Sequence, residues 1–235
     1  RPDVVASAEA TALAKKAQRS VDIDAWNRTR YVGWNFAGRR KHLWDRDRSV
    51  AQVELRNRKH LIRLADKSGI VFDAEGERLD GTEAKEALKE GWEAFVNASF
   101  WLTPIATLFN NDVVLGLSDD GELLVKYGSG GATPGDVYAL ALDDGGRLTG
   151  WKMWVSIIPV GGMEASFEGW TQLPTGAWVS TRHEGPFDFS LTELSGAERR
   201  DPTAPDPFAP LFEAGAPAGP ATQPTKPVQT ATAAP

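Results

Sequence analysis

The fold is decided by residues 31–73, which read YVGWNFAGRRKHLWDRDRSVAQVELRNRKHLIRLADKSGIVFD. Val32, Trp34 and Phe36 recur at every second position, the period at which strand side chains point to one face. Further short segments of this kind follow, with turn-forming residues between them. They cover residues 39–45, 49–55, 59–65 and 69–73. Strands so close in sequence pair as antiparallel hairpins, so this stretch predicts the body of an antiparallel sheet.

An amphipathic helix is predicted directly after these strands. Asp80, with Glu83 three residues later, resembles a capping box at a helix start. Apolar side chains then repeat at the spacing of one helical face. They are Ala84, Leu88, Trp92, Phe95, Val96 and Phe100. A short helical turn is expected from Pro104, because proline suits the first position of a helix.

The sequence before the strands predicts a second helix. Residues 4–20 are rich in Ala and Lys and contain neither Gly nor Pro. Val5, Ala8, Ala12, Leu13 and Ala17 lie near helical spacing. One amphipathic helix is therefore expected to open the domain.

After residue 112 the strand pattern returns. Turn sequences rich in Asp and Gly, at 118–121 and 143–146, separate pairs of apolar segments as hairpins require. The predicted strands are Val113–Leu117, Glu122–Tyr127, Val137–Leu142, Arg147–Ile157 and, approximately, 163–170, 176–184 and 187–194. Together with the earlier segments, these roughly ten or eleven strands predict an α+β, mainly β fold: a large curved antiparallel sheet or open, unclosed β-barrel with helices packed on one face.

The C-terminal segment differs in composition from the rest. Residues 201–235 hold nine of the fifteen prolines and end in a run of Ala, Thr and Pro. Such a segment cannot bury enough apolar surface to offset the entropy lost on ordering. We therefore expect a single domain over residues 1–200 and a disordered tail over 201–235. Phe208, Leu211 and Phe212 form one expected docking spot within that tail.

Composition excludes several classes of protein. The chain contains no cysteine, which removes disulfides, zinc ribbons, iron–sulfur clusters and thiol nucleophiles. No apolar run reaches the ~20 residues of a membrane-spanning helix. The numbering begins at Arg1 without a basic and apolar leader, so we expect that a signal peptide has been removed.

The net charge of −6 conceals a basic region. Between Arg19 and Lys67 there are thirteen Lys and Arg against six Asp and Glu, so the rest of the chain is acidic. The simplest interpretation is a set of solvated strand faces. The alternative is that the part from Arg28 to Lys67 meets an anionic membrane surface. The acidic total argues against a nucleic-acid partner.

Aromatic residues are the most prominent feature of the sequence. Nine tryptophans spread over nearly every expected element, and rings of this size bury ~150–250 Å² each. They form either a plain aromatic core or the lining of an apolar cavity between the curved sheet and its helices. In the second interpretation the ligand-binding residues are Trp34, Phe36, Trp92, Phe95, Phe100, Trp101, Tyr138, Leu140, Trp151 and Met153.

Patterns for catalysis or metal binding are weak. His42, His60 and His183 show no i, i+4 pair on a helix and no triad-like context. Asp45 and Asp47 share a strand face, but nothing supplies a nucleophile, a base and an oxyanion site together. The glycine-rich residues 128–136 lead into a strand, which favours a hairpin connection over a phosphate loop. The sequence therefore predicts a protein that is not an enzyme and needs no cofactor or metal.

The order helix, strands, helical insertion, strands resembles the LolA/LolB-like, outer-membrane lipoprotein-sorting superfamily. The similarity covers roughly residues 4–195. It includes the late segment GWTQLPTGAW at 169–178. The hairpin segment Val137–Trp154, followed by Ala165–His183, resembles the C-terminal half of the family's fold. The resemblance implies an incomplete barrel closed by helices that binds acyl chains in an apolar cavity without catalysis. It also implies a bacterial periplasmic or envelope-anchored location. A lid-locking arginine is implied as well, with Arg28, Arg30, Arg39 and Arg40 as candidates.

A second function fits the tryptophans. Exposed rings on a flat sheet face stack against sugars, and Trp154 lies on the strand face opposite Trp151. A glycan-binding β module is therefore the alternative to a carrier of acyl chains, lipids or lipoproteins.

Overall fold

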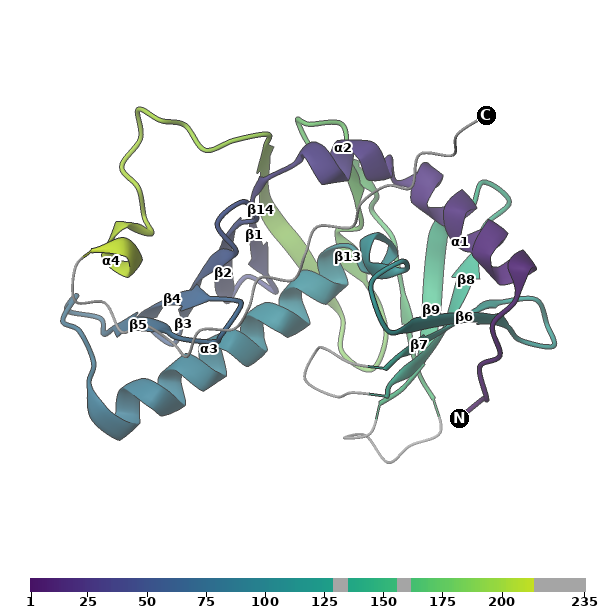
Figure 1. The fold of residues 1–235 in the computed structure, drawn as a ribbon, viewed down its shortest axis with the longest axis horizontal. Helices are drawn as coiled ribbons and strands as arrows, with labels where there is room; N and C mark the ends of the chain where they lie inside the picture. Colours follow the sequence, from purple (N-terminus) through teal and green to yellow (C-terminus); the bar gives the residue numbers. More distant parts are fainter. Residues whose placement is uncertain (129–134, 156–161, 214–235) are drawn as a thin grey trace, which may run out of the picture.

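The computed structural model describes residues 1–128, 135–155 and 162–213 (Figure 1). Over these residues two antiparallel sheets, neither of them closed, form most of the molecule, so the mainly β, α+β class is confirmed. The seven-stranded sheet has the order β13-β14-β1-β2-β3-β4-β5 and the five-stranded sheet the order β10-β9-β8-β7-β6. The strands of the larger sheet are β1 (Tyr31–Phe36), β2 (Arg40–Asp45), β3 (Val50–Leu55), β4 (Arg58–Arg63), β5 (Gly69–Phe72), β13 (Arg182–His183) and β14 (Phe189–Ala197).

The run of hairpins predicted from residues 31–73 is present. Strands β1 to β5 pair consecutively, with Trp34 opposite His42 and Val53 opposite both His42 and His60. Because side chains alternate along each strand, these residues share one face of the sheet, which we call the inner face. Strand β14 pairs antiparallel with the other edge of β1, and the register of this pair shifts between Gly33 and Asn35.

The later hairpins also form where the turns predict them. Strands β6 and β7 join at 118–121, and β8 and β9 join at 143–146. The smaller sheet consists of β6 (Val113–Leu117), β7 (Leu123–Tyr127), β8 (Val137–Leu142), β9 (Leu148–Trp154) and β10 (Met163–Ser166), and a separate pair of β11 (Thr171–Gln172) and β12 (Trp178–Val179) follows. Residues 129–134 of the glycine-rich connection, and 156–161 at the end of the predicted long strand, lie outside the described residues.

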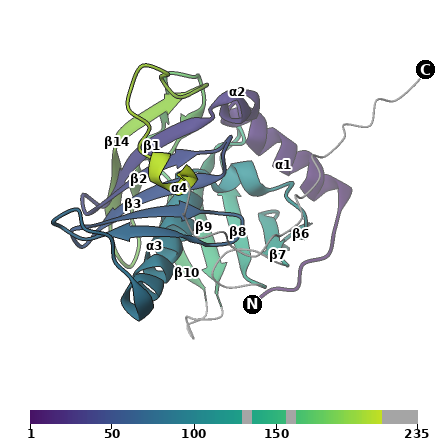
Figure 2. The same cartoon turned by 60° about the vertical axis from the view of Figure 1, so that its left-hand side comes forward.

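Helix α3 (Gly81–Leu102) crosses the inner face of the larger sheet (Figures 1 and 2). Its buried side chains include four small ones, Ala87, Gly91, Ala94 and Ala98. The face predicted from Ala84, Leu88, Trp92 and Val96 is only partly buried, because the small residues allow a closer approach to the strands. A Cβ placed on Gly91 would lie 2.8 Å from the His60 ring, so only glycine fits there.

The remaining N-terminal helices pack on the smaller sheet and at the top of the molecule in Figure 1. Helix α1 (Ala8–Ser20) begins later than predicted, because the Ser7 hydroxyl caps it by accepting from the Ala10 amide. It packs on β6 and β7. Helix α2 (Ile23–Arg28) follows, and the expected turn at Pro104 is the 3₁₀ helix η1 (Pro104–Thr107).

The first part of the predicted tail is folded rather than disordered. Residues 201–213 return to the larger sheet and end in helix α4 (Ala209–Phe212). There Phe208 and Leu211 are fully buried against Val50, Leu61 and Ile70, on the outer face of the sheet. A short segment rich in proline thus finds enough apolar contact to offset its ordering entropy. It also means that the helices do not all lie on one face.

Among the described residues, the helices include none that is both long enough and apolar enough to span a bilayer.

Candidate functional site

The ten residues predicted to contact a ligand lie in, or at the edge of, the large apolar cluster to which α3 and both sheets contribute. They come from β1, α3, β8 and β9, and all belong to the same apolar cluster or pack against it. Eight of them are buried, and Trp92 and Phe100 are partly exposed. The predicted set therefore belongs to one apolar region, to which α3 contributes four of the ten residues.

The C-terminal half of α3 carries the densest aromatic packing. The ring of Trp101 lies 4.6 Å from Trp151, 5.7 Å from Phe167 and 5.0 Å from Phe189, measured between ring centroids. Phe100, one position earlier, lies 5.3 Å from Trp151 and 5.3 Å from Tyr138. These distances are within the range of favourable offset and edge-to-face ring pairs. Side chains of both sheets are thus joined through one helix.

The middle of α3 rests on the larger sheet through Phe95. Its ring lies 6.1 Å from Trp34, 5.4 Å from Trp44 and 6.4 Å from His42. Trp34 and His42, opposite each other on β1 and β2, stack with centroids 4.8 Å apart. Burial lowers the pKa of His42 to about 3, so its imidazole is neutral at physiological pH.

Strand β2 places an unusual row of polar side chains on this inner face. Arg40, His42 and Trp44 alternate along it, and Arg46 follows directly after the strand. The Arg40 guanidinium lies 4.4 Å from the centre of the Phe36 ring, and burial lowers its pKa. The sequence analysis interpreted residues 40–46, RKHLWDR, as part of a charged surface. It did not identify that the side chains at positions 40, 42 and 44 face the interior.

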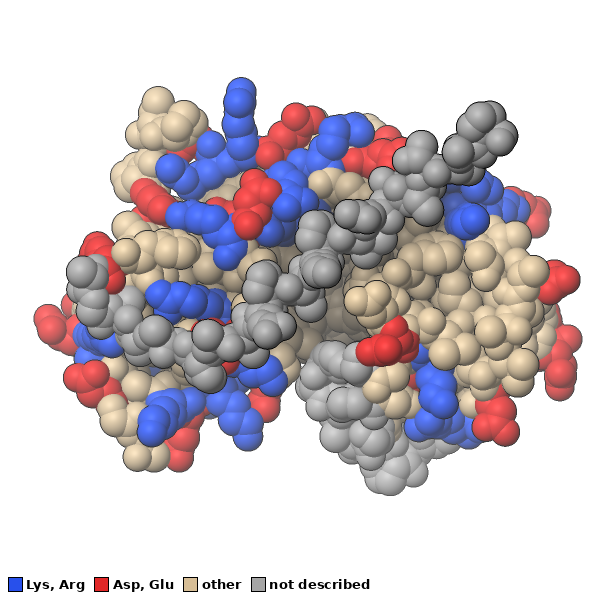
Figure 3. All heavy atoms as spheres, viewed as in Figure 1, with Lys and Arg blue, Asp and Glu red and all other residues tan. Residues whose placement is uncertain are grey.

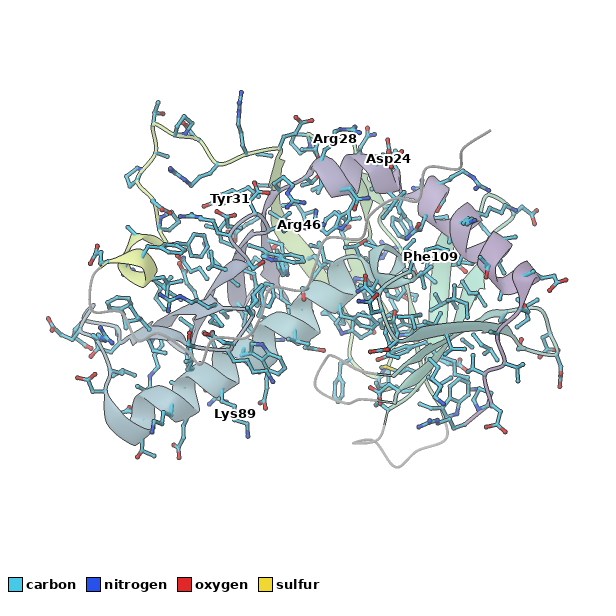
Figure 4. The ribbon with its side chains drawn as sticks, viewed as in Figure 1. Asp24, Arg28, Tyr31, Arg46, Lys89 and Phe109 are labelled. Atoms are coloured by element: carbon cyan, nitrogen blue, oxygen red, sulfur yellow. The ribbon has the colours of Figure 1, made fainter. Side chains whose placement is uncertain are left out.

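Arg46 is the arginine that holds a helix. Its guanidinium donates to the backbone carbonyls of Trp26 and Thr29 at the end of α2, and it lies over the rings of Trp26 and Trp44. Burial lowers its pKa to about 10. Figure 4 shows Arg46 below α2, between that helix and the strands. The resemblance implied a lid-locking arginine, and Arg46 was not among the candidates for it.

The four arginines singled out for that role have other contacts. Arg28 pairs with Glu198 and Arg30 with Asp47 at the surface. Arg39 is exposed in the β1–β2 turn. Sequence reasoning did not single out Arg46, because neither composition nor spacing indicates which cation meets the carbonyls of α2.

Two hollows lie on the surface. One, of about 320 Å³, is lined by Arg30, Tyr31, Asp45, Asp47, Arg48 and Arg200. The other, of about 600 Å³, lies over β8–β10 and is lined by Glu122, Lys152, Glu164, Glu184, neighbouring small residues and Trp151, which also belongs to the aromatic layer. Asp45 and Asp47 do share the first hollow, but each is bound to an arginine. Among the described residues no cluster of three metal-ligating side chains exists.

His183 is buried among rings instead of facing a substrate. It lies 4.7 Å from Phe167 and 4.8 Å from Phe189, and its Nδ1 lies 3.0 Å from the Ser166 carbonyl oxygen. Burial lowers its pKa to about 4. This environment is that of a structural core histidine.

The basic region is largely neutralised within the chain. Arg48, Arg56 and Arg58, like Arg28 and Arg30, are paired with carboxylates. Figure 3 accordingly shows blue and red atoms interspersed over the half of the molecule that contains the larger sheet. Within the part of the chain that the structure describes, the cations left without a carboxylate partner include Arg39, Lys59 and Lys67.

The tryptophans do not form an exposed platform. All nine lie in the described ranges and each is at least partly buried, including Trp154. Trp170 and Trp178 lie on either side of the Arg147 guanidinium, 5.1 Å and 4.6 Å from it. A flat glycan-stacking face would need two or three open rings.

Comparison of the chain with protein-family models, with curated proteins and with solved structures finds no match.

Proposed function

We propose that this protein is a non-catalytic carrier that binds an apolar ligand, such as an acyl chain, a lipid or the acyl part of a lipoprotein, between α3 and the sheets. The observation that carries the proposal is the aromatic layer beneath α3. Six predicted ligand residues, from β1 and the β8–β9 hairpin, share one apolar cluster with four residues of α3. An alkyl chain gains about 0.8 kcal/mol for each methylene group that it buries, and this gain offsets the cost of separating the rings that it displaces.

Helix α3 is the element that would move to admit the ligand. Its N-terminal half is fastened to the β3–β4 turn by surface ion pairs, Arg56–Glu90 at 2.8 Å and Arg58–Glu83 at 2.5 Å. Exposed pairs of this kind contribute little to stability. The helix otherwise rests on small side chains and rings, which can separate from the strands without breaking a buried ion pair. Ligand entry would open this layer as a lid opens.

A disulfide lock tests the lid directly. A Cβ on Gly91 would lie 3.0 Å from the His60 Cβ, so a small outward shift of α3 brings the two atoms to the ~3.5–4.5 Å of a disulfide. Because the chain has no cysteine, the double variant His60→Cys/Gly91→Cys can form only this bond within one molecule. We expect the reduced protein to take up lipid and the oxidised protein to take up none, measured by native mass spectrometry with extraction of the bound species.

Two controls carry one cysteine each: His60→Cys alone, and His60→Ala/Gly91→Cys, in which the ring that a Cβ at position 91 would meet is absent. They should bind lipid in both oxidising and reducing buffer. Equal lipid uptake by the oxidised and reduced double variant would remove α3 as the lid. A protein that carries no lipid after purification, and binds none on incubation with fatty acids and phospholipids, would overturn the carrier function itself.

The location and the membrane contact belong to the same proposal. The LolA/LolB resemblance supports a periplasmic or envelope-anchored protein, which cell fractionation tests. Arg39, Lys59 and Lys67 lie in the region from Arg28 to Lys67 and would meet an anionic headgroup. Co-sedimentation with vesicles of phosphatidylglycerol, but not of phosphatidylcholine, and its loss at high salt would support that contact.

A further inference from the structure

A group of polar atoms beneath Phe95 has nothing to bind. Among the described residues, Nε1 of Trp34, Nε1 of Trp44 and both ring nitrogens of His42 are buried without a hydrogen-bond partner. Trp34 is 2% exposed and His42 is 3% exposed. In folded proteins nearly all such atoms are satisfied, because an unpaired polar group in the interior is destabilising. Their lack of a partner therefore needs an explanation.

These atoms belong to one patch. Trp34 and His42 are paired across β1 and β2, and Trp44 lies two residues beyond His42 on the same face. The Phe95 ring of α3 covers all three, with ring centroids between 5.4 and 6.4 Å away. We call Trp34, His42 and Trp44 the donor patch. A movement of α3 away from the larger sheet would remove Phe95 from the donor patch and expose the patch to a ligand.

The chemistry of the donor patch defines its complement. An indole nitrogen can only donate, and a neutral imidazole donates through one nitrogen and accepts through the other. The patch therefore offers three donors and a single acceptor in an apolar surrounding. Its complement is a hydrogen-bond acceptor carried on an apolar body. A plain hydrocarbon would leave the donors unsatisfied.

We propose that the donor patch binds the carbonyl oxygen next to an acyl chain, so that the ligand is an ester-linked or amide-linked acyl lipid. This inference rests on the proposed function and specifies the ligand class. A neutral carbonyl is the acceptor that enters such an interior at the least desolvation cost, since a phosphate would arrive as a charge and a sugar would bring several hydroxyls. The alkyl chain would then lie among the rings around Trp101.

Two lysophospholipids that differ by one carbonyl test the proposal. The 1-palmitoyl and 1-O-hexadecyl lysophosphatidylcholines share a headgroup and a chain length, but only the first has an acyl carbonyl. Calorimetric titration of the full 235-residue chain below the micellar concentration gives both affinities. We expect the acyl form to bind about tenfold more tightly, the value of one good hydrogen bond. A matched amide-linked analogue distinguishes amide from ester as the preferred group.

Variants then assign the preference to the patch. His42→Phe should reduce the acyl advantage to within about twofold while leaving the affinity for the ether form unchanged, because His42 is not among the apolar ligand residues. Trp34→Phe should lower the ratio of the acyl to the ether affinity, and this ratio is the measure there because Trp34 also contacts the alkyl chain. Trp44→Phe is the third variant, in case one of the others fails to fold, as judged by circular dichroism. Trp178→Phe is the matched control, because Trp178, on β12, packs against Arg147 and does not belong to the donor patch. This variant should keep the full preference for the acyl form.

The outcomes separate the inference from the function. Equal binding of the acyl and ether forms would overturn the inference and leave the carrier function standing. An acyl advantage that persists in all the patch variants would also overturn it, since the carbonyl would be recognised elsewhere. Binding of neither lipid would overturn both.

Discussion

The two faces of the seven-stranded sheet are built on the same strands but are covered in opposite ways. On the outer face, the four-residue helix α4 buries Phe208 and Leu211, and the Asp206 carboxylate accepts two hydrogen bonds from Arg48, at 2.6 and 2.9 Å. On the inner face, the 22-residue helix α3 leaves the buried nitrogens of Trp34, His42 and Trp44 without partners among the described residues.

The difference teaches where binding capacity lies. The outer contact is small, but its polar groups are paired, so nothing is gained by replacing α4 with a ligand. The inner contact is large and apolar and has unmet hydrogen-bonding capacity. A ligand with an acceptor and an alkyl chain can therefore compete with α3 for the strands but has no similar opening on the outer face. Four predictions test this comparison.

The largest effect is expected from Trp101→Ala. This change removes the ring that joins α3 to Trp151, Phe167 and Phe189 and should lower the free energy of unfolding by about 3–5 kcal/mol. Urea denaturation followed by far-ultraviolet circular dichroism measures it. Phe187→Ala, at a side chain 85% exposed, is the control and should change stability by less than about 0.5 kcal/mol. Similar losses for both variants would contradict the inner layer as the centre of stability.

Phe208→Ala should have a smaller and local effect. The lost burial amounts to about 3 kcal/mol at most, and because α4 is near the end of the folded chain, that segment can detach while the sheets stay folded. We expect faster trypsin cleavage after Arg199 and Arg200, with little change in the main urea transition. A fall in the main transition as large as that of Trp101→Ala would show that the outer cover is integral to the domain.

Acid should weaken the inner face first. Burial lowers the pKa of His42 to about 3 and that of His183 to about 4, from an ordinary value of 6.5. Below pH 6.5 the unfolded chain binds protons that the folded chain excludes. The free energy of unfolding should therefore fall, by up to about 1.4 kcal/mol per pH unit for each histidine, until the folded pKa is reached.

Urea titrations at pH 7, 6, 5 and 4 measure this slope. In His42→Phe the slope should become shallower by one histidine's share, from pH 6.5 down to about pH 3, the pKa of His42 in the folded chain. A stability that does not vary between pH 7 and 5 would mean that the buried histidines are accessible to protons in the folded state.

The outer face should respond only at lower pH and more weakly. Hydrogen bonds from Arg48 lower the pKa of Asp206 to about 2, so its contribution is complete above its ordinary value of 3.8 and is lost as the pH falls through about 2. Because the pair is partly exposed, Asp206→Asn should cost about 1 kcal/mol at pH 7. Trypsin sensitivity after Arg200 should rise accordingly. An unchanged cleavage rate would show that Phe208 and Leu211 hold the segment without the ion pair.

Local patterns in the sequence predicted most of the strands and several turns. Alternation over residues 31–73 and the Asp–Gly turns at 118–121 and 143–146 depend on near neighbours, so they are readable without a structure. The start of α3 was predicted from the Asp80 and Glu83 pattern, but the expected capping bond is absent among the described residues. Glu83 pairs instead with Arg58, a partner 25 residues away that no local rule identifies.

The sequence by itself therefore determined most of the strands, the long helix α3, the mainly β class and the set of aromatic residues that could line an interior. Only the tertiary structure decided that Arg40, His42 and Trp44 face inward, that Arg46 meets the carbonyls of α2, and that residues 201–213 fold onto the outer face. The physical reason is that alternation divides a strand into two faces without saying which is covered. That choice depends on contacts between residues far apart in the chain, which the packing of α3 and α4 supplies.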